Sequence, residues 1–503
     1  MDARNAAIQH AISMLDGRIA ETRATHAYFL STTRGLEGRL RSLERQRNSL
    51  KNQIAKVSFL PDELLSMIFE HGCLPSPSLQ TGPPIEIVLS HVNQRFRDVA
   101  VNTRLLWARI EVLFRTPLDK VVTYLQRSRT CPFDFHLDID VDDGSDSDSE
   151  LVPDALLYTT AEWETIMSHM THCRHFSVRC SDSDLADGII NHLHMIKASL
   201  LQSIRFECSN GEFGFEPSRG AYRKIVEGGA PVLTTVRIVG LGLTECLPPL
   251  TTVTSLTLQR ANWWIKWSDL RAILTGCLAL THFVIEDILF DNIPDNFESS
   301  IVLTSLQSLH ILLDENNDDP HVDRILLAIS APVLDSLFIS SVIDQDLVDV
   351  SQIHNSDRFP RLRYLSVSPL PGEEISQESW TLFLSVFPRI THFTLLSDGR
   401  ATNALIMALR YSPSESASST ETVLMPELHT LSFDHLSAHA AHSICDLVPI
   451  WIAVGRPLKL LELSMSILND DALDKSVNHL RGLIEVKELQ SDGDEARAIW
   501  NQS

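Results

Sequence analysis

The chain has 503 residues, 44% of them hydrophobic and 21% charged, which allows about three domains at roughly 150 residues each and excludes a wholly disordered or fibrous protein. Its formal net charge of −23 repels phosphate backbones, so no nucleic-acid partner is expected, and no apolar run is long enough to span a membrane. Eight sparse cysteines without a CxxC pair, and an N-terminus without the apolar core of a signal peptide, predict free thiols and a cytoplasmic or nuclear protein.

Residues 1–56 are expected to form one long coiled-coil helix. No proline interrupts them, and alternating steps of four and three residues meet apolar side chains at eleven of fifteen positions. So narrow a stripe is typical of a helix that buries one face against a partner. A homodimer through residues 8–57 is one interpretation, and a spacer arm is another. Polar Thr22, His26 and Thr33 weaken the middle of the stripe, so a hairpin of two half-helices stays open as an alternative.

Residues 57–113 are predicted to form a short helical module with three apolar blocks. The blocks are Leu60-Pro61-x-Glu63-Leu64-Leu65-x-x-Ile68-Phe69, Leu89-Ser90-x-Val92-Asn93-x-x-Phe96-Arg97-x-Val99-Ala100 and Leu105-x-Trp107. Pro61 suits the first position of a helix, where its missing N–H costs nothing. A loop rich in proline, serine and glycine separates the first block from the second.

These blocks, in this order, resemble an F-box, in the F-box-like form found in fungi. Two departures are the long loop and Phe96, which stands where many relatives carry tryptophan. The resemblance implies docking to the Skp adaptor of a cullin-RING ubiquitin ligase. The residues implied for that surface are Leu60, Pro61, Leu64, Leu65, Ile68, Phe69, Leu89, Val92 and Trp107. A module this small cannot bury so many large apolar groups alone; the alternative is that they pack on the long helix or the next domain.

From residue 114 to 490, the sequence repeats the pattern apolar-x-x-apolar-x-apolar. The pattern occurs eleven times, first at Cys173 and last at Leu458, and four successive repeats from Leu306 to Ile390 are spaced by 28 residues. Helical stretches lie between the predicted strands. A unit of one strand and one helix cannot bury its apolar face alone, so we expect the units to stack into a solenoid with a parallel sheet on its concave side.

The repeats resemble leucine-rich repeats. The expected fold class is therefore an α/β solenoid of irregular leucine-rich repeats, preceded by an all-α F-box-like module and an N-terminal coiled-coil helix. The asparagine or cysteine that usually follows the last apolar position is missing, so irregular turns are expected. Residues 117–141 are predicted to be an atypical first unit, 142–152 an acidic loop, 470–490 the closing unit and 491–503 a C-terminal tail.

Residues between the buried strand positions are expected on the concave face, where a target protein would bind. Arg205 and Arg237 would be neighbours there and could hold a carboxylate or phosphate, although pairing with Glu207 is the alternative. An aromatic patch is predicted beside them, with incidental surface as its alternative. It comprises His282, His310, Phe338, Tyr364 and His392.

No motif points to an enzyme. The run from Asp138 to Gly144 fails the calcium-loop pattern, and His435, His439 and His442 lack an obvious further ligand. No catalytic residue, metal or cofactor is expected. The sequence instead predicts the substrate-receptor subunit of a cullin-RING ligase, which docks to the Skp adaptor and recruits an unknown target through its repeats. The alternative is a protein-interaction scaffold of leucine-rich-repeat type without ubiquitin transfer.

Overall fold

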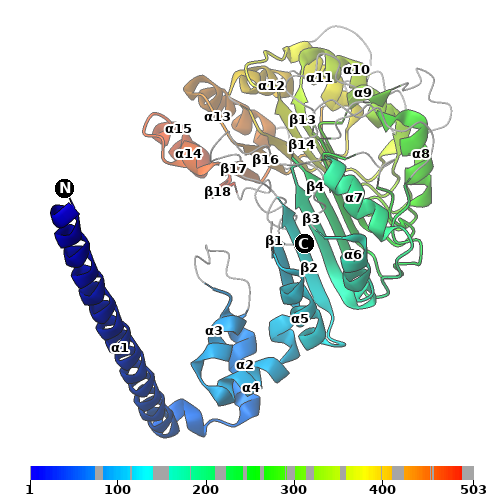
Figure 1. Ribbon diagram of the computed structural model, residues 1–503. Helices are drawn as coiled ribbons and strands as arrows, with labels where there is room; N and C mark the ends of the chain where they lie inside the picture. The colour runs from blue at the N-terminus through cyan, green and yellow to red at the C-terminus, as the bar shows by residue number, and fades with distance from the viewer. Residues whose placement is uncertain are drawn as a thin grey trace, which may run out of the picture. The chain divides into compact units, whose positions relative to one another are not determined.

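The structure is a computed structural model of the chain (Figure 1). It describes residues 2–73, 83–113, 116–139, 158–181, 183–209, 223–241, 246–260, 265–288, 290–291, 301–312, 322–351, 358–397, 399–410, 424–453, 455 and 458–489. The expected acidic loop at 142–152 and tail at 491–503 lie outside these residues. The chain divides into two compact units, a helical unit (Met1–Trp107) and a repeat unit (Ala108–Ser503).

The helical unit begins with helix α1 (Asp2–Ile54), which runs without a break. The hydroxyls of Thr22 and Thr33 donate to the carbonyls of Arg18 and Phe29, so these polar residues are satisfied inside the helix. The expectation of a single long helix is confirmed, and the hairpin alternative is wrong. The apolar stripe is exposed along the helix, and the coiled coil stays a prediction.

Three short helices form the compact part of the helical unit. They are α2 (Asp62–Gly72), α3 (Ile85–Val92) and α4 (Gln94–Asn102), with 3-10 turns η1 (Lys56–Phe59) and η2 (Arg104–Trp107) on either side. Asp62 and Glu63 lie in the first turn of α2, at the positive end of its dipole. The Asn93 side chain caps α4 by accepting the Phe96 N–H at 2.8 Å. Local sequence signals therefore set where these helices begin.

The repeat unit is built on a parallel sheet of fourteen strands whose spatial order follows the chain. The strands, in pairing order, are β1 (Arg109–Leu113), β2 (Phe133–Ile139), β3 (Cys173–Cys180), β4 (Ser203–Cys208), β5 (Thr235–Val239), β6 (Ser255–Gln259), β8 (His282–Glu286), β11 (Ser308–Leu312), β13 (Ser336–Val342), β14 (Tyr364–Pro369), β15 (His392–Leu395), β16 (Thr430–Phe433), β17 (Leu460–Leu463) and β18 (Glu485–Glu488). Two small pairs join β7 (Ile265–Lys266) to β9 (Phe290–Asp291) and β10 (Ile301–Val302) to β12 (Ile329–Ser330).

Helices line one side of this sheet (Figure 1). They are α5 (Leu118–Ser128), α6 (Thr160–Met167), α7 (Ser183–Leu193), α8 (Trp267–Gly276), α9 (Val322–Ala328), α10 (Asp344–Ser351), α11 (Gln377–Val386), α12 (Arg400–Arg410), α13 (Ala438–Ala453), α14 (Met465–Leu468) and α15 (Asp474–Arg481), with a 3-10 turn η3 (Met170–His172). Successive helices contact each other, as α10, α11, α12 and α13 do. The chain therefore stacks units of one strand and one helix, with some irregular units.

The apolar positions of the repeats form continuous columns between sheet and helices. Leu309, Leu337, Leu365 and Phe393 oppose one another on four adjacent strands, and all are buried. Burying one such side chain contributes about 1.5–3 kcal/mol, and neighbouring repeats supply the cover that no repeat has alone. The α/β solenoid-like fold expected from the repeats is confirmed; the assignment of the repeats to the leucine-rich type stays a prediction.

The boundary between the units differs from the one expected at residue 113. Residues 109–113 were placed in the helical module, but they form β1, in which Ile110 opposes Phe135 of β2. Ile110 and Val112 are buried while Arg109 and Glu111 are exposed. That alternation is the period of a strand with one buried face. At the other edge, α15 and β18 close the sheet within residues 470–490, as expected.

Candidate protein-binding surfaces

Helix α2 divides its apolar residues between two faces. Leu65 and Phe69, four positions apart, point into the helical unit and are 0% and 3% exposed. Leu64 and Ile68, also four positions apart, point outward and are 45% and 53% exposed. Residues at this spacing share one side of a helix, so α2 carries apolar side chains on its inner face and on its outer face alike.

Three of the residues expected on the docking surface belong to the core instead. Leu65, Phe69 and Trp107 are buried, which corrects their assignment to the surface. Phe69 packs on Phe96 with ring centroids 5.2 Å apart, and Trp107 Nε1 donates to the Ala100 carbonyl at 2.8 Å. Their physical role is to hold the three helices together. These contacts account for the aromatic positions of the sequence blocks.

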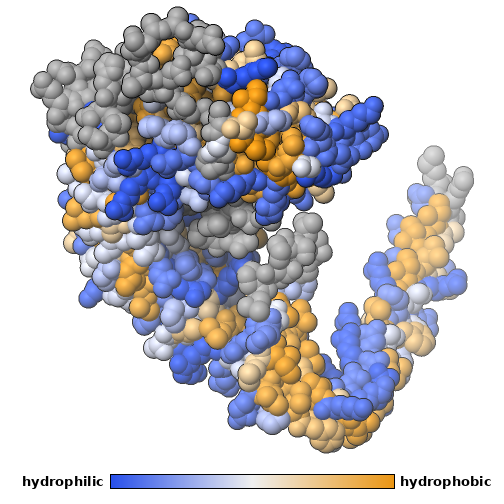
Figure 2. Space-filling view, turned by 180° about the vertical axis from the view of Figure 1, so that it is seen from behind, coloured by the Kyte–Doolittle hydropathy of each residue, from blue (hydrophilic) through white to orange (hydrophobic). Residues whose placement is uncertain are grey.

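The remaining expected residues lie at or near the surface. Val92 at the end of α3 is 50% exposed, Pro61 is exposed, and Leu60 and Leu89 are partly buried. Sequence reasoning missed other exposed apolar side chains nearby. These are Phe59, Met67, Val88 and Leu105. Figure 2 shows hydrophobic residues gathered over the helical unit.

Arg95 fixes the start of α2 against α4. Its Nε donates to Asp62 Oδ1 at 2.8 Å, and its Nη2 donates to the Leu60 carbonyl. Nearby, the hydroxyls of Ser66 and Thr103 are 2.9 Å apart. Sequence reasoning did not find Arg95, because its partners lie more than thirty positions away along the chain. These contacts set the outer face of α2 in one orientation relative to α4.

On the repeat unit, strand register brings the expected concave-face residues next to one another. Arg205 of β4 opposes Arg237 of β5, and Tyr364 of β14 opposes His392 of β15. Each alternates along its strand with buried residues. The neighbour relations expected from the repeat spacing are therefore those of the structure.

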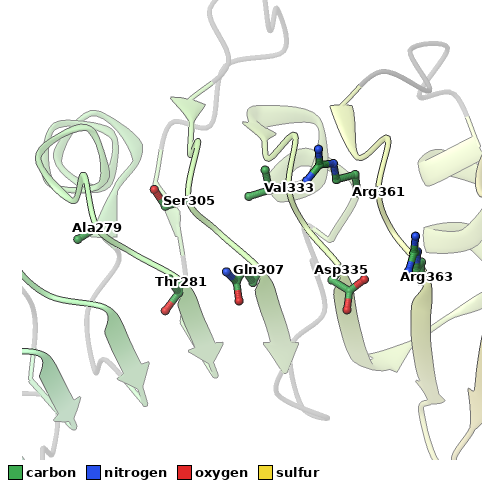
Figure 3. Close-up of a pocket in the computed structure, with 8 residues that line it drawn as sticks. All are labelled: Ala279, Thr281, Ser305, Gln307, Val333, Asp335, Arg361 and Arg363. Atoms are coloured by element: carbon green, nitrogen blue, oxygen red, sulfur yellow. The ribbon is translucent and has the colours of Figure 1, made fainter.

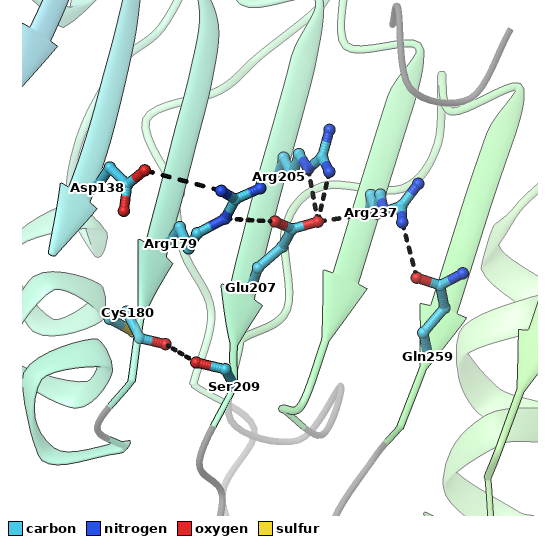
Figure 4. Close-up of polar contacts among 8 residues, drawn as sticks. All are labelled: Asp138, Arg179, Cys180, Arg205, Glu207, Ser209, Arg237 and Gln259. Carbon is cyan, nitrogen blue, oxygen red and sulfur yellow. Dashed lines mark hydrogen bonds and ion pairs between the residues drawn. The ribbon is translucent and has the colours of Figure 1, made fainter. Parts of the chain in front are cut away.

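A ladder of polar contacts crosses the concave face from β2 to β8 (Figure 4). Arg179 lies 3.7 Å from Asp138 and donates from Nε to Glu207 at 3.1 Å. Arg205 donates from Nε to the other oxygen of Glu207 at 2.8 Å, and Arg237 Nε lies 3.6 Å from that same oxygen. Three guanidinium groups therefore converge on one carboxylate.

The ladder continues beyond Arg237. Its Nη2 donates to Gln259 Oε1 at 2.9 Å, and Gln259 in turn donates to Glu286. The pairing of both arginines with Glu207, which the sequence left open, is thus present. It orients the two guanidinium groups side by side, and their binding of a target anion stays a prediction.

The ladder shifts the titration of its members in ways that follow from burial and charge. Burial opposes ionisation of Glu207, but Arg205 and Arg179 outweigh it, so the pKa of this carboxyl lies below its usual range. Burial, followed by repulsion from Arg205, lowers the pKa of Arg237. Glu207 thus stabilises two like charges that would otherwise repel each other.

The aromatic residues form two ring pairs. His310 of β11 lies against Phe338 of β13 with centroids 5.5 Å apart, and Tyr364 stacks on His392 at 4.3 Å. His282 of β8 lies beside His310, and its side chain is exposed. Burial, and then repulsion from His282, lowers the pKa of His310 to about 4. At neutral pH these imidazoles are uncharged, so this half of the concave face offers aromatic surface without net charge.

Nothing in the described part of the chain groups three or more metal-ligating side chains in a way that could hold an ion. Within the same residues, no helix is both long enough and apolar enough to cross a bilayer. The surfaces described above are therefore contact surfaces for other molecules, built from apolar, polar and aromatic side chains.

Comparison with known proteins adds little to this description. No family model matches the chain, and no curated protein matches it. A solved structure of the complex of Rad7 and Elc1 from yeast is similar over 90% of this chain and 99% of that chain, with 12% identity and a TM-score of 0.29. At that score the likeness supports no conclusion about function, which has to rest on the chain's own residues.

Proposed function

We propose that this chain is the substrate-receptor subunit of a cullin-RING ubiquitin ligase, with the outer face of α2 docking to a Skp-type adaptor. The observation that supports it is the exposure of Leu64, Ile68 and Val92 on a folded unit whose core is already complete without them. These are positions of the F-box-like blocks that no contact inside the unit explains. The residues that do pack inside, Leu65 and Phe69, alternate with them on the same helix.

The physical case for a partner rests on apolar area. Burying a fully exposed leucine or isoleucine contributes about 1.5–3 kcal/mol, so each half-exposed residue offers a partner about 1 kcal/mol. Met67 and Val88 extend the same apolar surface. The sum is of the size needed to offset part of the entropy lost on association. An adaptor with an apolar groove of matching shape would gain from every one of them.

The repeat unit would recruit the target. Its concave face combines the polar ladder with the two aromatic ring pairs, and both sets of side chains are held by their neighbours before any partner arrives. Ordering fewer side chains on binding favours affinity. In this proposal, catalysis is proximity alone: the receptor holds target lysines near a ubiquitin-loaded enzyme that its partners supply.

The test is co-purification of the full chain with a purified Skp adaptor. The wild-type chain should bind in a stoichiometric complex, and the double variant Leu64→Asp/Ile68→Asp should not, because two buried charges would replace the apolar contact. The matched control is Met195→Asp/Leu278→Asp, which changes two side chains of the repeat unit that are 74% and 73% exposed. That control should bind like wild type.

Two results would contradict the proposal. One is a folded, monodisperse wild-type chain that does not bind the adaptor, which would favour the scaffold alternative. The other is a Leu64→Asp/Ile68→Asp variant that binds as tightly as wild type. Circular dichroism of each variant shows whether its helices are intact before binding is measured.

A further inference from the structure

An open groove runs along the edge of the sheet at which the strands begin, across β8, β11, β13 and β14. Its volume is about 890 Å³, which falls within the range of known ligand sites. Eight residues line it. They are Ala279, Thr281, Ser305, Gln307, Val333, Asp335, Arg361 and Arg363.

The lining residues follow the repeat. Each of four successive repeats contributes two residues spaced two positions apart, one in the turn and one just before the strand. Figure 3 shows them as two rows, with Ala279, Ser305, Val333 and Arg361 in one and Thr281, Gln307, Asp335 and Arg363 in the other. The groove therefore crosses the strands, and both arginines lie on its last repeat.

One end of the groove is already satisfied within the chain. The Thr281 hydroxyl donates to the Thr254 carbonyl at 2.9 Å, and the Ser305 hydroxyl donates to the Leu278 carbonyl at 3.1 Å. Ala279 beside them is small and apolar. This end offers close packing to a ligand and few free polar groups.

The other end holds polar side chains without partners in the described residues. Gln307, Asp335, Arg361 and Arg363 make no side-chain hydrogen bond or ion pair there, and Gln307 and both arginines are exposed. Other arginines of these repeats are used inside the chain. Arg389 donates to the Pro360 carbonyl at 3.0 Å, and Arg358 donates to the Leu327 carbonyl.

The charge of the groove is opposite to that of the chain. Arg361 and Arg363 outnumber Asp335, so the groove is positive, whereas the chain has a formal net charge of −23. Two adjacent guanidinium groups favour a carboxylate or phosphate through charge-assisted hydrogen bonds. Asp335 and Gln307 beside them suit main-chain N–H and C=O groups.

We propose that this groove binds an extended acidic segment of a partner protein. Its acidic side chains pair with Arg361 and Arg363, its main chain bonds to Asp335 and Gln307, and a small residue packs against Ala279. Four strands about 4.8 Å apart span roughly 14 Å, which an extended chain covers in four to five residues at about 3.3 Å each. The site lies outside the concave face and does not depend on adaptor docking.

The test is fluorescence anisotropy with the full chain and a labelled hexapeptide that carries two adjacent glutamates. The control peptide has glutamine in place of both glutamates. The acidic peptide should bind wild type at least about tenfold more tightly than the glutamine peptide, and salt should weaken it. The variant Arg361→Glu/Arg363→Glu should lose that preference.

The matched control is Arg271→Glu/Arg410→Glu, which makes the same charge change at two exposed arginines outside the groove. It should bind the acidic peptide like wild type. Arg361→Gln/Arg363→Gln, which removes the charge without reversing it, should fall between the two. Thermal melts of each variant show that the fold is kept.

Three results would overturn the inference. They are no binding of the acidic peptide to wild type, equal binding to Arg361→Glu/Arg363→Glu, and tighter binding of a labelled single-stranded oligonucleotide than of the peptide. None of them bears on adaptor binding, which is measured separately.

Discussion

The two units expose opposite kinds of surface. The helical unit leaves large apolar side chains such as Leu64 and Ile68 half in water, although its core of Leu65, Phe69 and Trp107 is fully buried. The repeat unit buries its apolar columns and turns a polar and aromatic concave face outward, on which Arg205 and Tyr364 already contact neighbouring side chains. One unit has unsatisfied apolar area, and the other has satisfied polar contacts.

This difference teaches how each unit can recognise a partner. Apolar area drives association through burial with little demand on geometry. A preformed polar ladder adds little net affinity, but it rejects partners that leave its charges unpaired. A receptor that uses a constant adaptor and a selective target surface requires this division of roles.

The sharpest way to break the comparison is inside α2. Leu65→Ala should lower the free energy of unfolding of the helical unit by about 2–5 kcal/mol, because it empties a fully buried site. Leu64→Ala, one position away, should change it by less than about 0.5 kcal/mol. Native-state hydrogen exchange of the α2 amides measures both. Equal losses would show that the two faces of α2 are not distinct.

The polar ladder should show its strength through Glu207. Glu207→Gln leaves three guanidinium groups without their shared carboxylate and should cost about 1.5–3 kcal/mol of stability in urea unfolding. Because the folded pKa of Glu207 is lowered, its contribution is present above the unfolded pKa and lost as pH falls through the folded pKa. A variant as stable as wild type at pH 7 would mean that the ladder is only a surface arrangement.

The aromatic half should respond to pH in a different window. His310 has a folded pKa of about 4 against 6.5 for the free side chain, so the unfolded chain binds its proton first as pH falls. Stability should be flat above pH 7 and drop by about 2 kcal/mol between pH 7 and pH 5. His310→Gln should remove most of that drop in parallel urea titrations, and an unchanged drop would contradict the assignment.

The smallest expected effect belongs to the second ring pair. Tyr364→Leu removes the stacking on His392 and should cost about 0.5–1 kcal/mol, because both rings stay partly exposed. His392→Leu should cost a similar amount, and the double variant should cost less than the sum of the two. Strict additivity in thermal unfolding would show that the rings do not interact.

Repeat spacing made the concave face predictable. Once the apolar positions recur every 28 residues, the residues between them must oppose one another on adjacent strands. That is how Tyr364 was expected beside His392. Strand β1 escaped, because its five residues lie outside the repeat pattern and directly follow the module block that ends in Trp107.

The inner and outer faces of α2 could not be separated from the sequence. Leu64, Leu65, Ile68 and Phe69 are all apolar, so periodicity gives two equivalent stripes, and only packing on Phe96 selects Leu65 and Phe69 for the core. The edge groove was also missed. Arg361 and Arg363 flank a buried repeat position in a turn, where no pattern marks the residues that stacking brings together.

The measurement that tests the central claim most directly is hydrogen exchange of the full chain with and without the purified adaptor. The account predicts protection of peptides from α2 and α3, which contain Leu64, Ile68 and Val92, with no change in the strands of the concave face. Protection confined to the concave strands, or no protection anywhere at saturating adaptor, would contradict it.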